Sequence, residues 1–92
     1  MKLVGRELLE AFQLTHADAR GQIASWVAEV ESATWKTPND VTARYASASF
    51  LAENTVIFNI KGNAYRLEVR IAYQTGVVVA LWVGTHAEYS KR

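Results

Sequence analysis

A strict alternation of apolar and polar residues in the second half of the chain constrains the fold most. Between Tyr65 and Tyr73 every odd-numbered residue is apolar or aromatic, whereas Arg66, Glu68 and Arg70 occupy even positions. Side chains of a β-strand point alternately to opposite faces, so this pattern is typical of a strand with one buried and one wet face. It therefore predicts an antiparallel sheet with a single covered face.

Two more strand patterns flank this segment at short distance. Residues Thr55–Ile60 are predicted to form a strand with Val56, Phe58 and Ile60 on one face, and Lys61-Gly62-Asn63 forms a tight connection to the next strand. After a second turn at Gln74-Thr75-Gly76, the run Val77–Val83 is apolar on both faces, which is typical of a central strand. Short turns between sequential strands indicate an antiparallel meander.

The half before residue 55 has helical periodicity instead. Apolar spacings of three and four predict a helix over about 5–14 and a longer one over about 16–33, opened by a Thr15-x-x-Asp18 capping box. A second capping box with Pro at the first helical position predicts a short helix over Thr37–Tyr45, and 46–54 is expected to be a loop. Helices that cover the apolar face of the sheet give an α+β fold.

Composition limits the chain to one small domain. It has 92 residues, of which 50% are apolar, so there is room for one core only. There is no Cys, which excludes disulfide and thiol chemistry and fits a reducing compartment. No apolar run approaches the roughly 20 residues of a membrane helix, and charges interrupt any leader-like N-terminus.

The net charge of +1 conceals an asymmetry between the two halves. Residues 1–54 carry five Lys/Arg and seven Asp/Glu, whereas residues 55–92 carry five Lys/Arg and only two Asp/Glu. The half that is predicted to be sheet therefore has a charge of +3. A local basic face suits a polyanion, although +3 is a weak signal for nucleic-acid binding.

The chemically richest segment follows the last predicted strand. Gly84-Thr85 is expected to end that strand, and His86, Glu88 and Tyr89 come directly after it. Imidazole titrates near neutral pH and can take or give a proton. The simpler interpretation is a strand end with a solvated polar turn.

Arg66 and Arg70 are predicted to share one face of their strand, about 13–14 Å apart at a rise of about 3.4 Å per residue. They could hold one phosphate and its neighbour, and Glu68 between them could orient one of them. The alternative is a cross-strand charge pair on a wet surface. Two distant His and no Cys argue against a zinc site, and no P-loop, dinucleotide fingerprint or acyl-transfer triad is present.

These segments together resemble a known family. Val56–Leu67, Val69–Ile71 and Gly84–Tyr89 resemble, in order and spacing, the HigB-type toxins of bacterial toxin–antitoxin pairs, and Trp35–Pro38 with Asp40-Val41 also fits. Relatives often have Asp where this chain has Ser90, so no catalytic weight falls on residue 90 or on the C-terminal tail. The resemblance implies a RelE-like fold as a single domain over 1–92, with N-terminal helices on an antiparallel sheet of three to four strands.

The resemblance also implies a cytoplasmic mRNA endonuclease that acts on translating ribosomes, with a helix-turn-helix antitoxin as partner and no metal, membrane or small-molecule cofactor. His86 would act as acid or base, with Tyr89 as its partner or as the second proton-transfer group. Glu88 would orient His86, and Arg66 and Arg70 would stabilise the phosphate. RNA binding is expected of Lys61, Asn59, Asn63 and Lys91. The alternatives are a module of the same fold that binds RNA or protein without cleavage, and a purely structural interaction domain.

Overall fold

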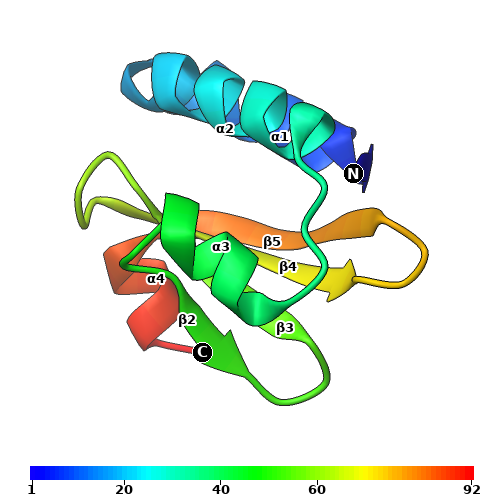
Figure 1. Ribbon diagram of the computed structural model, residues 1–92. Coiled ribbons are helices and arrows are strands. Elements are labelled where there is room, and N and C mark those ends of the chain that lie inside the picture. Colours follow the sequence, from blue (N-terminus) through cyan, green and yellow to red (C-terminus); the bar gives the residue numbers. More distant parts are fainter.

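The computed structural model describes residues 1–92 in full, as two layers (Figure 1). Helices α1 and α2 lie side by side over one face of a sheet, and the short α4 lies near the C-terminus on the opposite side. In chain order the elements are β1 (Lys2–Val4), α1 (Arg6–Thr15), a 3-10 turn (Ala17–Ala19), α2 (Arg20–Ser32), α3 (Pro38–Arg44), β2 (Ser49–Leu51), β3 (Thr55–Ile60), β4 (Tyr65–Ala72), β5 (Val77–Thr85) and α4 (His86–Ser90).

The sheet has five strands in the order β1-β5-β4-β3-β2. The pairs β2–β3, β3–β4 and β4–β5 are antiparallel, the last two as expected, but β1 pairs with β5 in parallel. The expected three to four strands were therefore too few. Both missed strands, β1 and β2, are three residues long, and β2 lies in the segment 46–54 that was expected to be a loop.

The alternation in β4 separates a buried face from a charged face, as predicted. Its odd-numbered residues from Tyr65 to Ile71 are buried, and the even-numbered Arg66, Glu68 and Arg70 lie on the other face. Buried side chains of the helices, including Trp26, pack on this apolar face and complete the core. The opposite face, called the open face below, carries the charged residues of β4 and is covered only in part, by α4.

Two capping boxes were predicted at helix starts, and the structure contains one of them. Asp40 accepts the backbone N–H of Thr37 at 3.2 Å, so the predicted capping box of α3 is confirmed. The expected box at Thr15 and Asp18 was wrong, because the Thr15 hydroxyl donates to the carbonyl of Phe12 and Asp18 bonds to distant residues instead. A 3-10 turn therefore precedes α2, which begins at Arg20.

The last strand is longer than the sequence predicted. Strand β5 runs through Thr85 with a bulge opposite Glu68 and Val69, instead of ending at Val83. Thr85 then caps α4, so the expected break at Gly84-Thr85 is a direct transition from strand to helix. The chain thereby delivers His86 at the end of the strand that lies beside β4.

Candidate active site

Arg66 sits at the centre of a polar cluster at one end of the open face. Arg66 is on β4, where the strand register places it opposite Asn59 of β3 on one side and opposite Gly84 of β5 on the other. Its Nη1 donates to the amide oxygen of Asn59 and to that of Asn63 at 3.0 Å. We call Arg66 with Asn59, Asn63, His86 and Tyr89 the Arg66 cluster.

His86 meets the same guanidinium from the other side. Its Nδ1 lies 3.0 Å from Nη2 of Arg66. A guanidinium has donors only, so Nδ1 must accept, and the ring proton of the neutral imidazole is then on Nε2. This pairing fixes both the tautomer and the direction of the ring. It also leaves Nε2 without a protein partner on an exposed residue.

Glu88 has a role other than the expected one of orienting His86. Its Oε1 accepts the backbone N–H of Thr85 at 2.8 Å, and its own N–H donates to the Thr85 hydroxyl at 3.1 Å. Hydrogen bonding of the Glu88 carboxylate to the Thr85 backbone, and second to the Thr85 side chain, lowers the pKa of Glu88, so the carboxylate stays an acceptor. Glu88 thus fixes the start of α4. It positions the backbone of His86 in this way, but it does not contact the imidazole.

Tyr89 lies one helical turn further and faces the cluster with its ring. The Arg66 guanidinium carbon is 5.8 Å from the Tyr89 ring centroid, and the ring of Trp82 is 6.0 Å away. Gly84 permits this packing, because a Cβ there would lie 2.5 Å from the Trp82 ring and 2.9 Å from Oε1 of Glu88. The close approach of ring, strand and helix therefore needs glycine at residue 84.

The other expected site residues lie outside the cluster. Arg70 is at the far end of β4, half-exposed, with Glu53 at 3.6 Å as its ion-pair partner. The ammonium of Lys61 is 3.0 Å from Asp18, which ties the β3–β4 turn to the helical layer. Lys91 is exposed in the turn that follows α4. Of the two arginines, the structure thus brings only Arg66 to His86.

One residue near the cluster, Arg92, was not expected there. Arg92 lies with its guanidinium carbon 4.7 Å from the Trp82 ring centroid and 5.1 Å from that of Tyr89. Glu68, which was expected to orient a neighbouring arginine of its own strand, pairs with Arg92 at 2.5 Å. Arg92 follows the last helix and has no periodic pattern, so the sequence held no signal for this contact.

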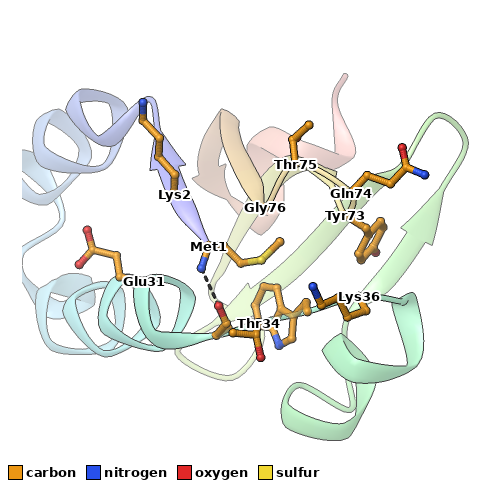
Figure 2. Close-up of a pocket in the computed structure, with 11 residues that line it drawn as sticks. Met1, Lys2, Glu31, Thr34, Lys36, Tyr73, Gln74, Thr75 and Gly76 are labelled. Atoms are coloured by element: carbon orange, nitrogen blue, oxygen red, sulfur yellow. Dashed lines mark hydrogen bonds between the residues drawn. The ribbon is translucent and has the colours of Figure 1, made fainter.

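The largest cavity, about 440 Å³, lies elsewhere, at the opposite end of β4 and β5. Figure 2 shows Met1, Lys36 and Tyr73 around it, with the Met1 amine donating to the carbonyl of Ala33 at 2.6 Å. It contains no His, and its one carboxylate, Glu31, is already paired with an arginine of α1. The cavity therefore offers no imidazole for proton transfer, whereas the Arg66 cluster places one beside a guanidinium.

Two further features are absent from the fold. Nowhere do three or more His, Cys, Asp or Glu side chains gather in a way that could hold a metal ion. None of the helices combines the length and the hydrophobicity that crossing a membrane requires.

Comparison with known protein families agrees with the observed fold. Residues 19–92 match the HigB_toxin family, described as the RelE-like toxic component of a toxin-antitoxin system. The chain belongs to this family. As a HigB-family member it is the toxin of a toxin–antitoxin pair, and an antitoxin is its partner. No individual curated protein matches the chain.

Proposed function

We propose that this toxin is an endoribonuclease that cleaves messenger RNA on the translating ribosome and so inhibits translation. The observation that carries the proposal is the 3.0 Å contact between the Arg66 guanidinium and Nδ1 of His86. It places a permanent cation, suited to a phosphate, beside a group that can move a proton. A module that only binds RNA needs the cation but not the imidazole.

RNA supplies its own nucleophile, which explains why no activated Ser or Cys is needed. The 2′-oxygen attacks the adjacent phosphorus and gives up its proton to a base. The bond from phosphorus to the 5′-oxygen breaks, and that oxygen takes a proton from an acid. The products are a 2′,3′-cyclic phosphate and a 5′-hydroxyl. The balance closes without a metal ion or a cofactor.

The residues of the Arg66 cluster can be assigned to these steps. Arg66 keeps its contacts within the cluster and offers its remaining N–H donors to the oxygens of the scissile phosphate, where the charge of the phosphorane develops. Because Arg66 occupies Nδ1 of His86, the free Nε2–H gives its proton to the leaving 5′-oxygen, and Tyr89 acts as the second proton-transfer group at the 2′-hydroxyl. Asn59 and Asn63 hold Arg66 in place through their amide oxygens.

Outlying cations contribute binding in this proposal. Arg70 lies about 13–14 Å along the strand from Arg66, from a rise of about 3.4 Å per residue, which suits a neighbouring phosphate. Lys61 and Lys91 add weaker contacts to the backbone. A net charge of +1 is low for a protein that binds RNA alone. The ribosome would therefore present the message, in the cytoplasm, and a helix-turn-helix antitoxin would neutralise the toxin.

A message with one 2′-deoxy nucleotide tests the mechanism. Ribosomes that carry this message or its all-ribose counterpart are mixed with the purified toxin, and the ends are mapped. We expect a 2′,3′-cyclic or 3′-phosphate end on the intact message, also in EDTA where ribosome binding tolerates it, and no cut at the deoxy site. Cutting there with a 5′-phosphate end would contradict the proposal. Binding of the message without any cleavage would favour the non-catalytic module.

A further inference from the structure

The turn that follows α4 is tied to the middle of the sheet by one ion pair. Nη1 of Arg92 lies 2.5 Å from Oε1 of Glu68, which is on the open face of the central strand β4. The Glu68 side chain is only 15% exposed, whereas that of Arg92 is 40% exposed. Oε1 of Glu68 is buried and has no hydrogen-bond partner, so the contact is an ion pair without hydrogen-bond geometry, and the charge of Arg92 compensates that of the carboxylate.

The same guanidinium lies against two aromatic rings. Arg92 is 4.7 Å from the centroid of Trp82 and 5.1 Å from that of Tyr89. Tyr89 is therefore approached by two guanidiniums, since Arg66 lies 5.8 Å from the same ring. Both contacts are within the range of cation–π attraction, and together they restrict where the phenol can go.

Helix α4 needs such an anchor. It has five residues and none of them is buried, and a helix this short does not form by itself in water. The Thr85–Glu88 bonds fix its first turn. At its other end the backbone N–H of Arg92 reaches the carbonyl of Tyr89 at 3.3 Å, and the Arg92 side chain returns to the sheet.

We propose that the Glu68–Arg92 pair positions Tyr89, and with it the end of α4, against Arg66. Arg92 is then a positioning residue that acts through Tyr89 and does not touch the RNA. This inference rests on the proposed nuclease function. The rival explanation is that Arg92 is another phosphate contact, which Glu68 holds back in the free protein.

The two explanations predict opposite effects of Glu68→Gln on cleavage. If Arg92 contacts phosphate, Glu68→Gln frees it and lowers KM for the message. If Arg92 positions Tyr89, Glu68→Gln releases the end of α4 and lowers kcat. Arg92→Ala alone does not separate them as cleanly, because both explanations predict a loss.

Kinetics of message cleavage on ribosomes with this set of variants is the decisive experiment. Glu68→Gln and Arg92→Ala should each lower kcat about tenfold and change KM less than about threefold, in the lower range of one acid–base contribution. The double variant should be no worse than either single one, because both break the same contact. Arg92→Lys, which keeps the charge but loses the planar stack, should fall between Arg92→Ala and wild type.

Arg44→Ala is the matched control for activity. Arg44 also pairs with a carboxylate, Glu29, at 2.7 Å, but on the helical layer. The Arg44→Ala variant should keep the kcat and KM of wild type. Additive losses from Glu68→Gln and Arg92→Ala, or a lowered KM with Glu68→Gln, would overturn the positioning role.

NMR of the free protein gives a readout that does not depend on cleavage. The Trp82 indole N–H and the Tyr89 ring protons should shift in Glu68→Gln and Arg92→Ala, but not in Lys91→Ala, which removes a neighbouring charge without an ion pair to the sheet. Buried Trp26 and Trp35 should keep their shifts and report an intact core. Unchanged Trp82 and Tyr89 signals would overturn the inference. A wild-type protein that cuts no message would overturn the proposed function alone, and these spectra would still decide whether Arg92 positions Tyr89.

Discussion

The two ends of strand β4 carry the same residue type on the same face, yet they have different surroundings. At one end Arg66 contacts two asparagine amides, one imidazole and the face of one phenol ring. At the other end Arg70 has one carboxylate, at 3.6 Å, from Glu53, whose side chain is 81% exposed. Alternation assigned both arginines to one face, but only the neighbouring strands decided which of them joins a site.

Under the proposed function, the difference explains why Arg66, and not Arg70, would stabilise the reacting phosphate. A charge on a wet surface is screened and its side chain is mobile, so its effect on a reacting phosphate is small. Arg66 is held by Asn59 and Asn63 before any substrate arrives, and such preorganisation is the main source of electrostatic stabilisation in enzymes. Arg70 lacks these restraints.

Replacing the two arginines in turn should give the largest contrast. We expect Arg66→Ala to lower kcat for message cleavage by about 100-fold, the usual effect of losing one donor to a developing oxyanion. Arg70→Ala should change kcat by less than about threefold and raise KM modestly. The measurement is single-turnover cleavage on ribosomes, after circular dichroism has shown that both variants are folded.

Lysine substitutions sharpen this contrast. Lys cannot reproduce the fork that bonds to Asn59, Asn63 and His86 together, so Arg66→Lys should remain nearly as impaired as Arg66→Ala. Arg70→Lys keeps a point charge and should behave like wild type. If Arg70→Ala proved as damaging as Arg66→Ala, the two ends of β4 would be equivalent in function and the assignment of the site to one end would fail.

Glycine substitutions at the two ends should produce a smaller effect. A Cβ at Gly84, opposite Arg66, would press on Trp82 and Glu88, so Gly84→Ala should displace α4 and lower kcat about tenfold, with a loss of stability of about 1–3 kcal/mol from overpacking. Gly76→Ala, at the Arg70 end, faces open space but has φ +72°, so it should cost about 1–2 kcal/mol and leave kcat unchanged. Urea titrations and cleavage assays together separate strain from displacement.

Gly21→Ala is the control for this pair of substitutions. Gly21 is in helix α2 and a Cβ there meets nothing within 4 Å, so the change should stabilise the protein by about 0.5–1 kcal/mol. Cleavage by Gly84→Ala at the wild-type rate would mean that the position of α4 does not matter for activity.

Repeated local motifs show what the sequence could and could not predict. The pattern Thr-x-x-Asp/Glu occurs at Thr15, Thr37 and Thr85, and it caps a helix at the last two. At the first, Asp18 bonds to Tyr65 and Lys61, which are more than 40 residues away in sequence. A local motif thus predicts a cap only where no distant partner competes for the carboxylate.

The same distinction applies to the sheet and to the site. Strands β3 and β4 could be predicted because each has six or more residues with an apolar side chain at every second position, whereas three-residue β1 and β2 are too short to show such a pattern. A tight β3–β4 turn brings Asn59 opposite Arg66, so this pair was within reach of sequence reasoning. The contact of Arg92 with Glu68 was not, because it depends on where a terminal turn folds back in space.

The smallest expected effect concerns stability at the Arg66 end, where Asp18 ties the β3–β4 turn to the helical layer. Its carboxylate accepts the Tyr65 hydroxyl at 2.6 Å and the Lys61 ammonium at 3.0 Å, and these bonds, the Tyr65 bond first, lower the pKa of Asp18 below its usual value. The native state therefore binds a proton less readily than the unfolded chain. The resulting stabilisation is complete above the ordinary pKa of about 3.9 and is lost as the pH falls through the lowered native pKa.

Urea midpoints at pH 7 and at pH 3 measure this contribution. Wild type should lose stability between the two, and Asp18→Asn should be less stable at pH 7 and lose less on acidification, because its side chain cannot take up a proton. Tyr65→Phe removes the largest cause of the shift, so Asp18→Asn should cost less in that background. Glu53→Gln, which breaks the exposed pair at the Arg70 end, should lower the midpoint at pH 7 much less than Asp18→Asn. Equal losses from Asp18→Asn and Glu53→Gln would mean that the two ends of β4 are anchored alike, and that the difference between them lies in the active-site side chains alone.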